Sequence, residues 1–245
     1  MEQKIEVWGH RGGYKPENTL KSFQSAIDNK LDGVEFDIWL TSDDDIVIIH
    51  GGLDGELVVG QSGDYIFDHT VEELQEVQLG EGQTIPTFRE LLDLNKKTLF
   101  LDIEIKIPTN LDLKTKYRME KLVDQLLKLV EEYDLADRSM ISSFDFDVLK
   151  ILKERDAKVP IGYLFESPDQ IPEGIAKGDY VLARADYSQS EYIEKAHADG
   201  FKFGVWAFKE FEETEEFYQQ MKEKNVDCVI GDFPNLGLKA YGREQ

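Results

Sequence analysis

The sequence of 245 residues contains one cysteine, relatively few basic residues and no long apolar run. Its single cysteine, Cys228, cannot form a disulfide within the chain, which is typical of proteins in a reducing compartment. No segment is long and apolar enough to span a bilayer, and the opening residues MEQKIEVWG lack the apolar core of a secretory signal. We therefore expect a cytoplasmic protein.

Basic residues are outnumbered, since 28 Lys and Arg stand against 50 Asp and Glu and the formal net charge is -22. Binding to nucleic acid or to an anionic membrane depends on basic side chains, so this balance argues against both partners. It favours a small-molecule substrate, and an anionic substrate would require positive charge within the site itself. The composition does not indicate an oligomeric state.

The stretch from Gly33 to His50 carries a pattern that indicates chemistry. Glu35 and Asp37 alternate with apolar residues, so a strand would place both carboxylates on one face, about 7 Å apart. A polar turn follows, and the apolar run 46–49 predicts a short arm that returns His50 to the two acids. Taken alone, the stretch could equally be a surface hairpin with a solvated polar face.

Strand-like and helix-like segments alternate along the whole chain. Eight strands are expected if 46–49 is an arm off the second strand. Eight β/α units in this length favour an α/β fold of the (β/α)8 TIM-barrel type over a doubly wound sheet. We expect a single domain over residues 1–245, with 51–84 as a hairpin and loop excursion after the second strand that lies over the barrel mouth.

The spacing of apolar residues also predicts individual helices. These include a long helix over 113–133 and a short helix near 168–176. We interpret the acidic run 210–216 as the solvated start of a further helix, where acids are favoured by the helix dipole. Residues 236–245 are expected to form a tail.

Polar residues occupy the predicted carboxyl ends of the strands, where TIM barrels carry their functional side chains. The first three strands and the arm would bring together three carboxylates, two imidazoles and two cations: Glu35, Asp37 and Glu104; His10 and His50; Arg11 and Lys106.

Three clustered carboxylates repel one another, by about 4 kcal/mol per pair at roughly 4 Å in an effective dielectric of about 20. Such a cluster persists if the acids are protonated or if a cation lies among them, and oxygen ligands favour Mg²⁺ or Ca²⁺ over zinc. With a divalent ion, the three acids retain one negative charge and a phosphodiester adds a second. Arg11 and Lys106 would offset both, so an anionic-phosphate site is predicted inside an acidic protein.

Two of the four histidines suit general acid–base catalysis, because the pKa of imidazole lies near neutral pH. His10 and His50 converge with the acids, so one could deprotonate an attacking oxygen while the other protonates the leaving oxygen. We interpret His69, in a polar loop, and His197, on a helix, as structural.

Short motifs occur in a fixed order along the chain: His10-Arg11-Gly12, Pro16-Glu17-Asn18-Thr19, Glu35-x-Asp37, Thr41-x-Asp43, His50, Glu104-Ile105-Lys106, Ser143-Phe144, Trp206 and Gly231-Asp232-Phe233-Pro234. In this order and spacing, and over nearly the whole chain, the sequence resembles the glycerophosphodiester phosphodiesterase family. The resemblance implies a TIM barrel of lipid and glycerol metabolism that uses a divalent cation. Such an enzyme hydrolyses deacylated glycerophospholipids to glycerol 3-phosphate and an alcohol.

The same resemblance implies a role for each matching residue. His10 and His50 would form the acid–base pair, and Glu35, Asp37 and Glu104 would bind one Mg²⁺ or Ca²⁺ ion. The substrate-binding residues would be Arg11 and Lys106 on the phosphate, together with Glu17 and the pocket-wall aromatic Trp206.

The sequence departs from the family pattern at three points. Only residues 13–15 separate the first two motifs, Gly51 stands where the family usually has Asp, and a common Arg-Thr-Thr run is absent. These departures affect the pocket rim and leave the preferred head group open, but they remove no proposed ligand or base.

Other functions on this fold are a lysophospholipase D-like or sphingomyelinase D-like phosphodiesterase, a non-catalytic phosphate-binding barrel and a sugar isomerase. Glu104 favours the glycerophosphodiesterases over the first group, whose third ligand is typically Asp. A non-catalytic barrel would be expected to lack a metal ligand or a histidine, and none is missing here. The paired histidines with two cations fit a phosphate substrate better than a sugar, which disfavours an isomerase.

Overall fold

A computed structural model of the protein describes residues 4–166, 179–207 and 213–243. Within these residues eight parallel strands form a closed barrel, which β1 completes by pairing with both β11 and β2. In order around the barrel, the strands are β1 (Glu6–Gly9), β2 (Gly33–Leu40), β6 (Phe100–Ile105), β7 (Ser139–Ser143), β8 (Ile161–Phe165), β9 (Tyr180–Arg184), β10 (Lys202–Trp206) and β11 (Cys228–Gly231). The predicted (β/α)8 TIM barrel is confirmed.

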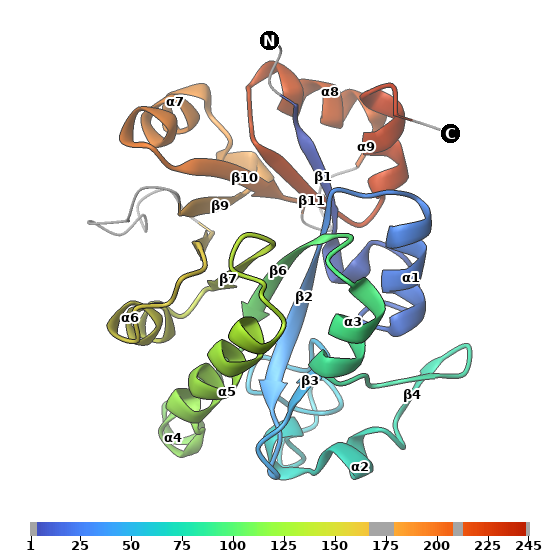
Figure 1. Cartoon of the computed structure of the whole chain (residues 1–245), viewed down its shortest axis with the longest axis vertical. Coiled ribbons are helices and arrows are strands. Elements are labelled where there is room, and N and C mark those ends of the chain that lie inside the picture. Colours follow the sequence, from blue (N-terminus) through green and yellow to red (C-terminus); the bar gives the residue numbers. More distant parts are fainter. Residues whose placement is uncertain (1–3, 167–178, 208–212, 244–245) are drawn as a thin grey trace.

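Helices surround the barrel between successive strands (Figure 1). They are α1 (Leu20–Asp28), α3 (Phe88–Asn95), α4 (Leu111–Lys116), α5 (Met119–Glu132), α6 (Phe146–Glu154), α7 (Ser190–Asp199), α8 (Glu215–Glu223) and α9 (Pro234–Ala240). Several begin at a Thr or Asp side chain that accepts a hydrogen bond from a backbone N–H of the first turn, as at Thr19, Thr87 and Asp145. The helix expected near 168–176 lies outside the described residues.

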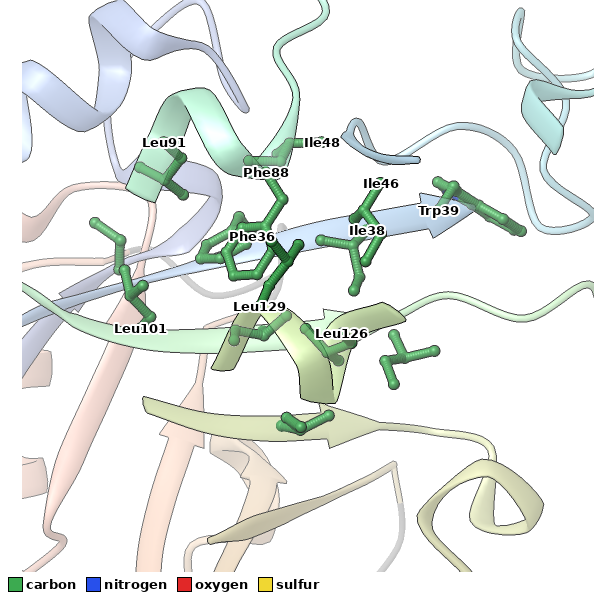
Figure 2. Packing of buried hydrophobic residues seen from close by; sticks show 14 of the residues in the cluster. Phe36, Ile38, Trp39, Ile46, Ile48, Phe88, Leu91, Leu101, Leu126 and Leu129 are labelled. Atoms are coloured by element: carbon green, nitrogen blue, oxygen red, sulfur yellow. The ribbon is translucent and has the colours of Figure 1, made fainter. Parts of the chain in front are cut away.

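The alternating sequence of strand β2 places apolar side chains on the outer face of the barrel and acidic side chains on its inner face. Phe36 points outward and packs against Phe88 of α3, with ring centroids 5.6 Å apart, within the large apolar layer shown in Figure 2. Successive side chains of a strand point to opposite faces, so Glu35 and Asp37 face the barrel interior. The parallel pairing of β2 with β6 places Asp37 beside Glu104.

The barrel interior is filled by apolar side chains that come from several strands. Trp8, Met140, Leu182 and Ile230 belong to one buried cluster, and the ring of Trp8 stacks on Phe100 at 5.0 Å. A packed interior leaves the carboxyl ends of the strands as the place for a site.

A short arm and an excursion follow β2. The arm, β3 (Ile46–Ile48), pairs antiparallel with β2. The excursion then contains the 3-10 turn η2 (Ile66–Asp68), α2 (Val71–Leu74), β4 (Gln78–Gly80) and β5 (Gln83–Thr84), beside the carboxyl end of β2 (Figure 1). Asp54 accepts hydrogen bonds from the Thr109 hydroxyl at 2.8 Å and the Asn110 N–H at 2.6 Å. These contacts tie the excursion to the segment after β6.

The single helix expected over 113–133 is wrong, because the segment forms two helices, α4 and α5. Tyr117 has an extended backbone that ends α4. Its buried ring lies 5.7 Å from that of Trp39, and its hydroxyl accepts a hydrogen bond from the Leu40 N–H. Contacts of Tyr117 with β2 therefore accompany the interruption between α4 and α5. The spacing of apolar residues in the sequence does not reveal this interruption, because it continues across Tyr117.

The tail expected over 236–245 is also wrong in its first part, which belongs to α9. Pro234 lies in the first helical turn, where its missing N–H needs no partner. Leu238 is buried, and the Tyr241 hydroxyl donates to the carbonyl of Tyr218 on α8 at 2.9 Å. None of the helices in the described part of the chain has the length and apolar character of a membrane span.

Candidate active site

The turn after β1 carries the first site residues. Its short 3-10 segment, η1 (His10–Gly12), contains Arg11 in the left-handed region at φ 50°, and Gly13 follows at φ 76°. A Cβ on Gly13 would lie 2.8 Å from the Cα of Gly9, so the turn requires a glycine there. This conformation directs the Arg11 N–H at Glu35 Oε2, 2.9 Å away.

Three buried acids form the centre of the site. Glu35, Asp37 and Glu104 each offer a carboxylate oxygen, and these oxygens lie within 4.8 Å of one another. All three residues belong to the adjacent strands β2 and β6 and are buried. The predicted convergence of the three carboxylates is therefore present.

Two cations lie against the acids. Lys106 Nζ lies 2.8 Å from Glu104 Oε1 and 3.5 Å from Asp37 Oδ1. Arg11 Nε lies 3.4 Å from Asp37 Oδ2, and an Arg11 terminal nitrogen donates to Glu17 Oε1 at 2.7 Å. The positive charge that an anionic substrate would need is thus present, and Glu17 holds the arginine at the rim.

The acids differ in how well their charges are compensated. Burial alone would raise the pKa of Asp37, but Lys106, His50 and Arg11 together hold that pKa well below its usual range. Burial and the neighbouring charges of Asp37 and Glu104 raise the pKa of Glu35 well above its usual value. Burial also raises the pKa of Glu104 against the opposing charge of Lys106. The two cations therefore do not balance the three acids.

This excess of buried negative charge fits a divalent cation. Glu35 Oε1 is buried and has no hydrogen-bond partner among the described residues. A buried carboxylate oxygen without a donor is costly unless a cation faces it. The donors of Glu35, Asp37 and Glu104 are all oxygens, the ligands that hard ions such as Mg²⁺ and Ca²⁺ prefer.

Each of the two predicted histidines has one ring nitrogen engaged. His10 Nδ1 lies 2.7 Å from Asp232 Oδ1, and its Nε2 lies 3.8 Å from Glu35 Oε2. His50 Nδ1 lies 2.7 Å from the carbonyl oxygen of Gly51. Burial, opposed by the charge of Asp37, lowers the pKa of His50 to about 4. His50 is therefore neutral near pH 7.

Trp206 ends β10, at the same end of the barrel as the acids. Its ring packs edge-on against Phe144, which follows β7, with centroids 5.7 Å apart. Phe144 is partly exposed, so the two rings form an aromatic wall at the barrel mouth.

Comparisons with known proteins identify the family to which the chain belongs. Residues 10–236 match the model of the glycerophosphoryl diester phosphodiesterase family, and this range includes the acids, cations, histidines and Trp206 described above. The chain belongs to this family. Its activity is the hydrolysis of glycerophosphodiesters, so the alternatives of a non-catalytic barrel and a sugar isomerase are set aside.

Individual family members resemble the chain along its length. It is 28% identical to a glycerophosphodiester phosphodiesterase of Caldanaerobacter subterraneus, covering 94% of this chain and 95% of the relative. A solved glycerophosphodiester phosphodiesterase from Thermotoga maritima is 25% identical with a TM-score of 0.74, covering 98% and 99% of the two chains. A phosphodiesterase of Oleispira antarctica, solved with its product sn-glycerol-3-phosphate, is 24% identical with a TM-score of 0.77, covering 97% and 96%.

This phosphodiesterase site contains supporting residues that the sequence analysis did not assign. Asn18 donates to Asp37 Oδ2 at 2.8 Å, and Ser142 donates to buried Asp102 at 2.6 Å. Burial, opposed by the bond from Ser142, raises the pKa of Asp102 to about 8. Asn18 and Asp232 lie in two of the short motifs described in the sequence analysis, and membership of these motifs could have indicated a role for both residues. Asp102 shares the inward face of its strand with Glu104.

Proposed function

We propose that the chain hydrolyses glycerophosphodiesters to sn-glycerol 3-phosphate and an alcohol, with one divalent cation held by Glu35, Asp37 and Glu104. The observation that carries this proposal is the buried triad of acids, whose oxygens lie within 4.8 Å of one another. The Oleispira antarctica relative, which was solved with sn-glycerol-3-phosphate, supports a small-molecule substrate of this class.

Charge accounts for the way the site would take an anionic phosphodiester. When bound, a divalent ion offsets negative charge and polarises a phosphoryl oxygen. Three acids and that ion leave one negative charge, and the phosphodiester adds another. Arg11 and Lys106 offset these two charges from the positions they occupy beside Asp37. Mg²⁺ and Ca²⁺ both fit the donor set.

His10 and His50 divide the proton transfers between them in this proposal. His50 is neutral near pH 7, and with its Nδ1 directed at Gly51 its Nε2 can exchange a proton with the substrate. Asp232 orients the ring of His10 through its contact with Nδ1. One histidine removes a proton from the attacking oxygen and the other gives a proton to the leaving oxygen.

The attacking oxygen belongs either to water or to the neighbouring glycerol hydroxyl. Attack by the hydroxyl would form a cyclic glycerol phosphate that water then opens. Phosphorus NMR during turnover distinguishes the two routes, because only the second produces the cyclic species as an intermediate.

The other inferences from sequence belong to the same proposal. Residues 1–245 form one domain, and the excursion 51–84 covers the barrel mouth, a position supported by the bonds of Asp54 to Thr109 and Asn110. Trp206 lines the pocket wall beside Phe144. The single cysteine, Cys228, is free and buried, which supports a cytoplasmic location. The role in lipid and glycerol metabolism rests on the family.

Calorimetric titration of Mg²⁺ and Ca²⁺ tests the proposed ligands. Glu104→Gln removes one of three charges, so we expect the affinity for both ions to fall about 10-fold or more, together with activity. Glu132→Gln is the matched control, because its exposed carboxylate pairs with Arg89 on the outer surface. Unchanged ion binding in Glu104→Gln would refute the assignment.

A further inference from the structure

One buried carboxylate has no part in the functions assigned so far. Glu213 lies in the acidic run interpreted from sequence as solvated, and that interpretation is wrong at this residue because it is only 9% exposed. Its Oε1 accepts a hydrogen bond from the backbone N–H of Asp232 at 2.7 Å. Its Oε2 accepts bonds from the Phe233 N–H at 3.0 Å and the Tyr218 hydroxyl at 2.7 Å.

These bonds hold the loop after β11 by its backbone. Charged acceptors make hydrogen bonds about twice as strong as neutral ones, so one carboxylate that spans two successive N–H groups strongly restrains this loop. Gly231 allows the approach, since a Cβ there would lie 2.4 Å from both Glu213 Oε2 and the Tyr218 hydroxyl oxygen. The absence of a side chain at Gly231 therefore leaves room for the Glu213 carboxylate beside the loop.

The restrained loop carries the partner of a proposed catalytic histidine. Asp232 Oδ1 lies 2.7 Å from His10 Nδ1. An ionised carboxylate only accepts hydrogen bonds, so it stabilises the tautomer with the proton on Nδ1 and leaves Nε2 to exchange protons. A shift of the Asp232 backbone would misplace this carboxylate and release the imidazole.

We propose that Glu213 is a positioning residue for the hydrolysis: through the backbone of residues 232–233 it sets Asp232, and through Asp232 it sets the orientation and tautomer of His10. The inference rests on the proposed role of His10 as one of the acid–base pair. Glu213 itself touches neither the acids nor the cations named above in the contacts the structure describes.

The test is steady-state kinetics of Glu213→Gln, alone and in a His10→Ala background. Glutamine keeps the size of the side chain but places an NH₂ group against one of the two N–H donors. We expect kcat to fall about 10- to 100-fold with KM nearly constant, because a misplaced catalytic group costs turnover rather than binding. In the His10→Ala background, the same substitution should change kcat less than about twofold, because no imidazole remains to be positioned.

Two further measurements separate positioning from a structural role. Histidine ¹⁵N NMR should show His10 protonated on Nδ1 in the wild type and a mixture of tautomers in Glu213→Gln. Glu215→Gln is the matched control, since its carboxylate near the same helix start pairs with Lys239, and it should keep wild-type kcat. If Glu213→Gln does not fold, Tyr218→Phe carries the test, because it removes one donor to Glu213 and should lower kcat several-fold only when His10 is present.

The outcomes distinguish this inference from the proposed function. Equal losses from Glu213→Gln with and without His10, or an unchanged His10 tautomer, would overturn the positioning role while His10 stays catalytic. A fully active His10→Ala enzyme would instead contradict the acid–base role of His10 in the proposed function, on which this inference rests.

Discussion

Two acids that are neighbours on one strand face have opposite electrostatic surroundings. Asp37 contacts two cations and accepts a bond from Asn18, so its pKa is low despite complete burial. The only donor to Glu35 is the Arg11 N–H among the contacts described, and burial raises its pKa. The chemistry of each carboxylate therefore follows from its partners and not from its residue type.

His10→Ala and His50→Ala should each lower kcat by about 10²- to 10⁴-fold, the usual contribution of a general acid or base. KM should change little, because affinity rests on Arg11, Lys106 and the ion. Comparing a natural alcohol with a nitrophenyl leaving group assigns the roles, since nitrophenolate leaves without a proton and loss of the acid then costs less. Equal losses on both substrates for both variants would contradict the division of labour between the histidines.

Elements with strict alternation could be predicted from sequence, and elements decided by distant contacts could not. The strands at Glu35 and Glu104 could be predicted because strict alternation of polar and apolar residues over a short run is typical of a strand. The break at Tyr117 depends on its bond to Leu40, and burial of Glu213 depends on a loop near the chain end. Similarly, the motifs contained Asp232, but only the fold places it against His10.

One acid before β2 ties three parts of the chain together. Asp32 accepts bonds from Lys4 at 2.6 Å, the Val7 N–H at 2.9 Å and Arg243 at 3.0 Å. Burial would raise its pKa, but the bonds from Arg243 and Lys4 lower it below the ordinary value. Because the folded pKa is the lower one, this stabilisation is complete above the unfolded pKa of about 4 and is lost as pH falls through the folded pKa.

Asp32→Asn should therefore lower the free energy of unfolding by about 1–3 kcal/mol at pH 7. The difference from wild type should shrink as pH falls below the unfolded pKa of about 4 and through the lowered pKa of Asp32, because the wild-type carboxyl is then protonated as well. Urea unfolding at several pH values measures both effects. Asp28→Asn, whose exposed carboxylate accepts only from Gln24 among the bonds described, is the control. A difference that does not vary with pH would contradict this account of Asp32.

The whole molecule is strongly acidic, with a net charge of -22, yet its site keeps two cations for an anionic group. An anionic substrate is repelled on approach by the overall charge, and salt screens that repulsion over about 10 Å at 0.1 M. Local cations then act at contact, where screening is weak. The overall negative charge therefore repels an anionic substrate at long range, and the two cations attract it once it has reached the site.

Raising ionic strength from about 0.02 to 0.2 M should increase kcat/KM about twofold or more for glycerophosphoglycerol, which carries a net negative charge. Zwitterionic glycerophosphocholine should respond less, because its net charge is zero. Identical salt responses of the two substrates would show that the overall charge does not influence association.

Release of sn-glycerol 3-phosphate is the measurement that tests the central claim most directly. A coupled assay across several head groups should detect this product with Mg²⁺ or Ca²⁺, lose it with a chelator and recover it when the ion is restored. Under the same conditions, Glu104→Gln should release product about 10-fold or more slowly at ion concentrations that saturate the wild type. Full release of glycerol 3-phosphate in the presence of chelator, or wild-type activity in Glu104→Gln, would contradict the account.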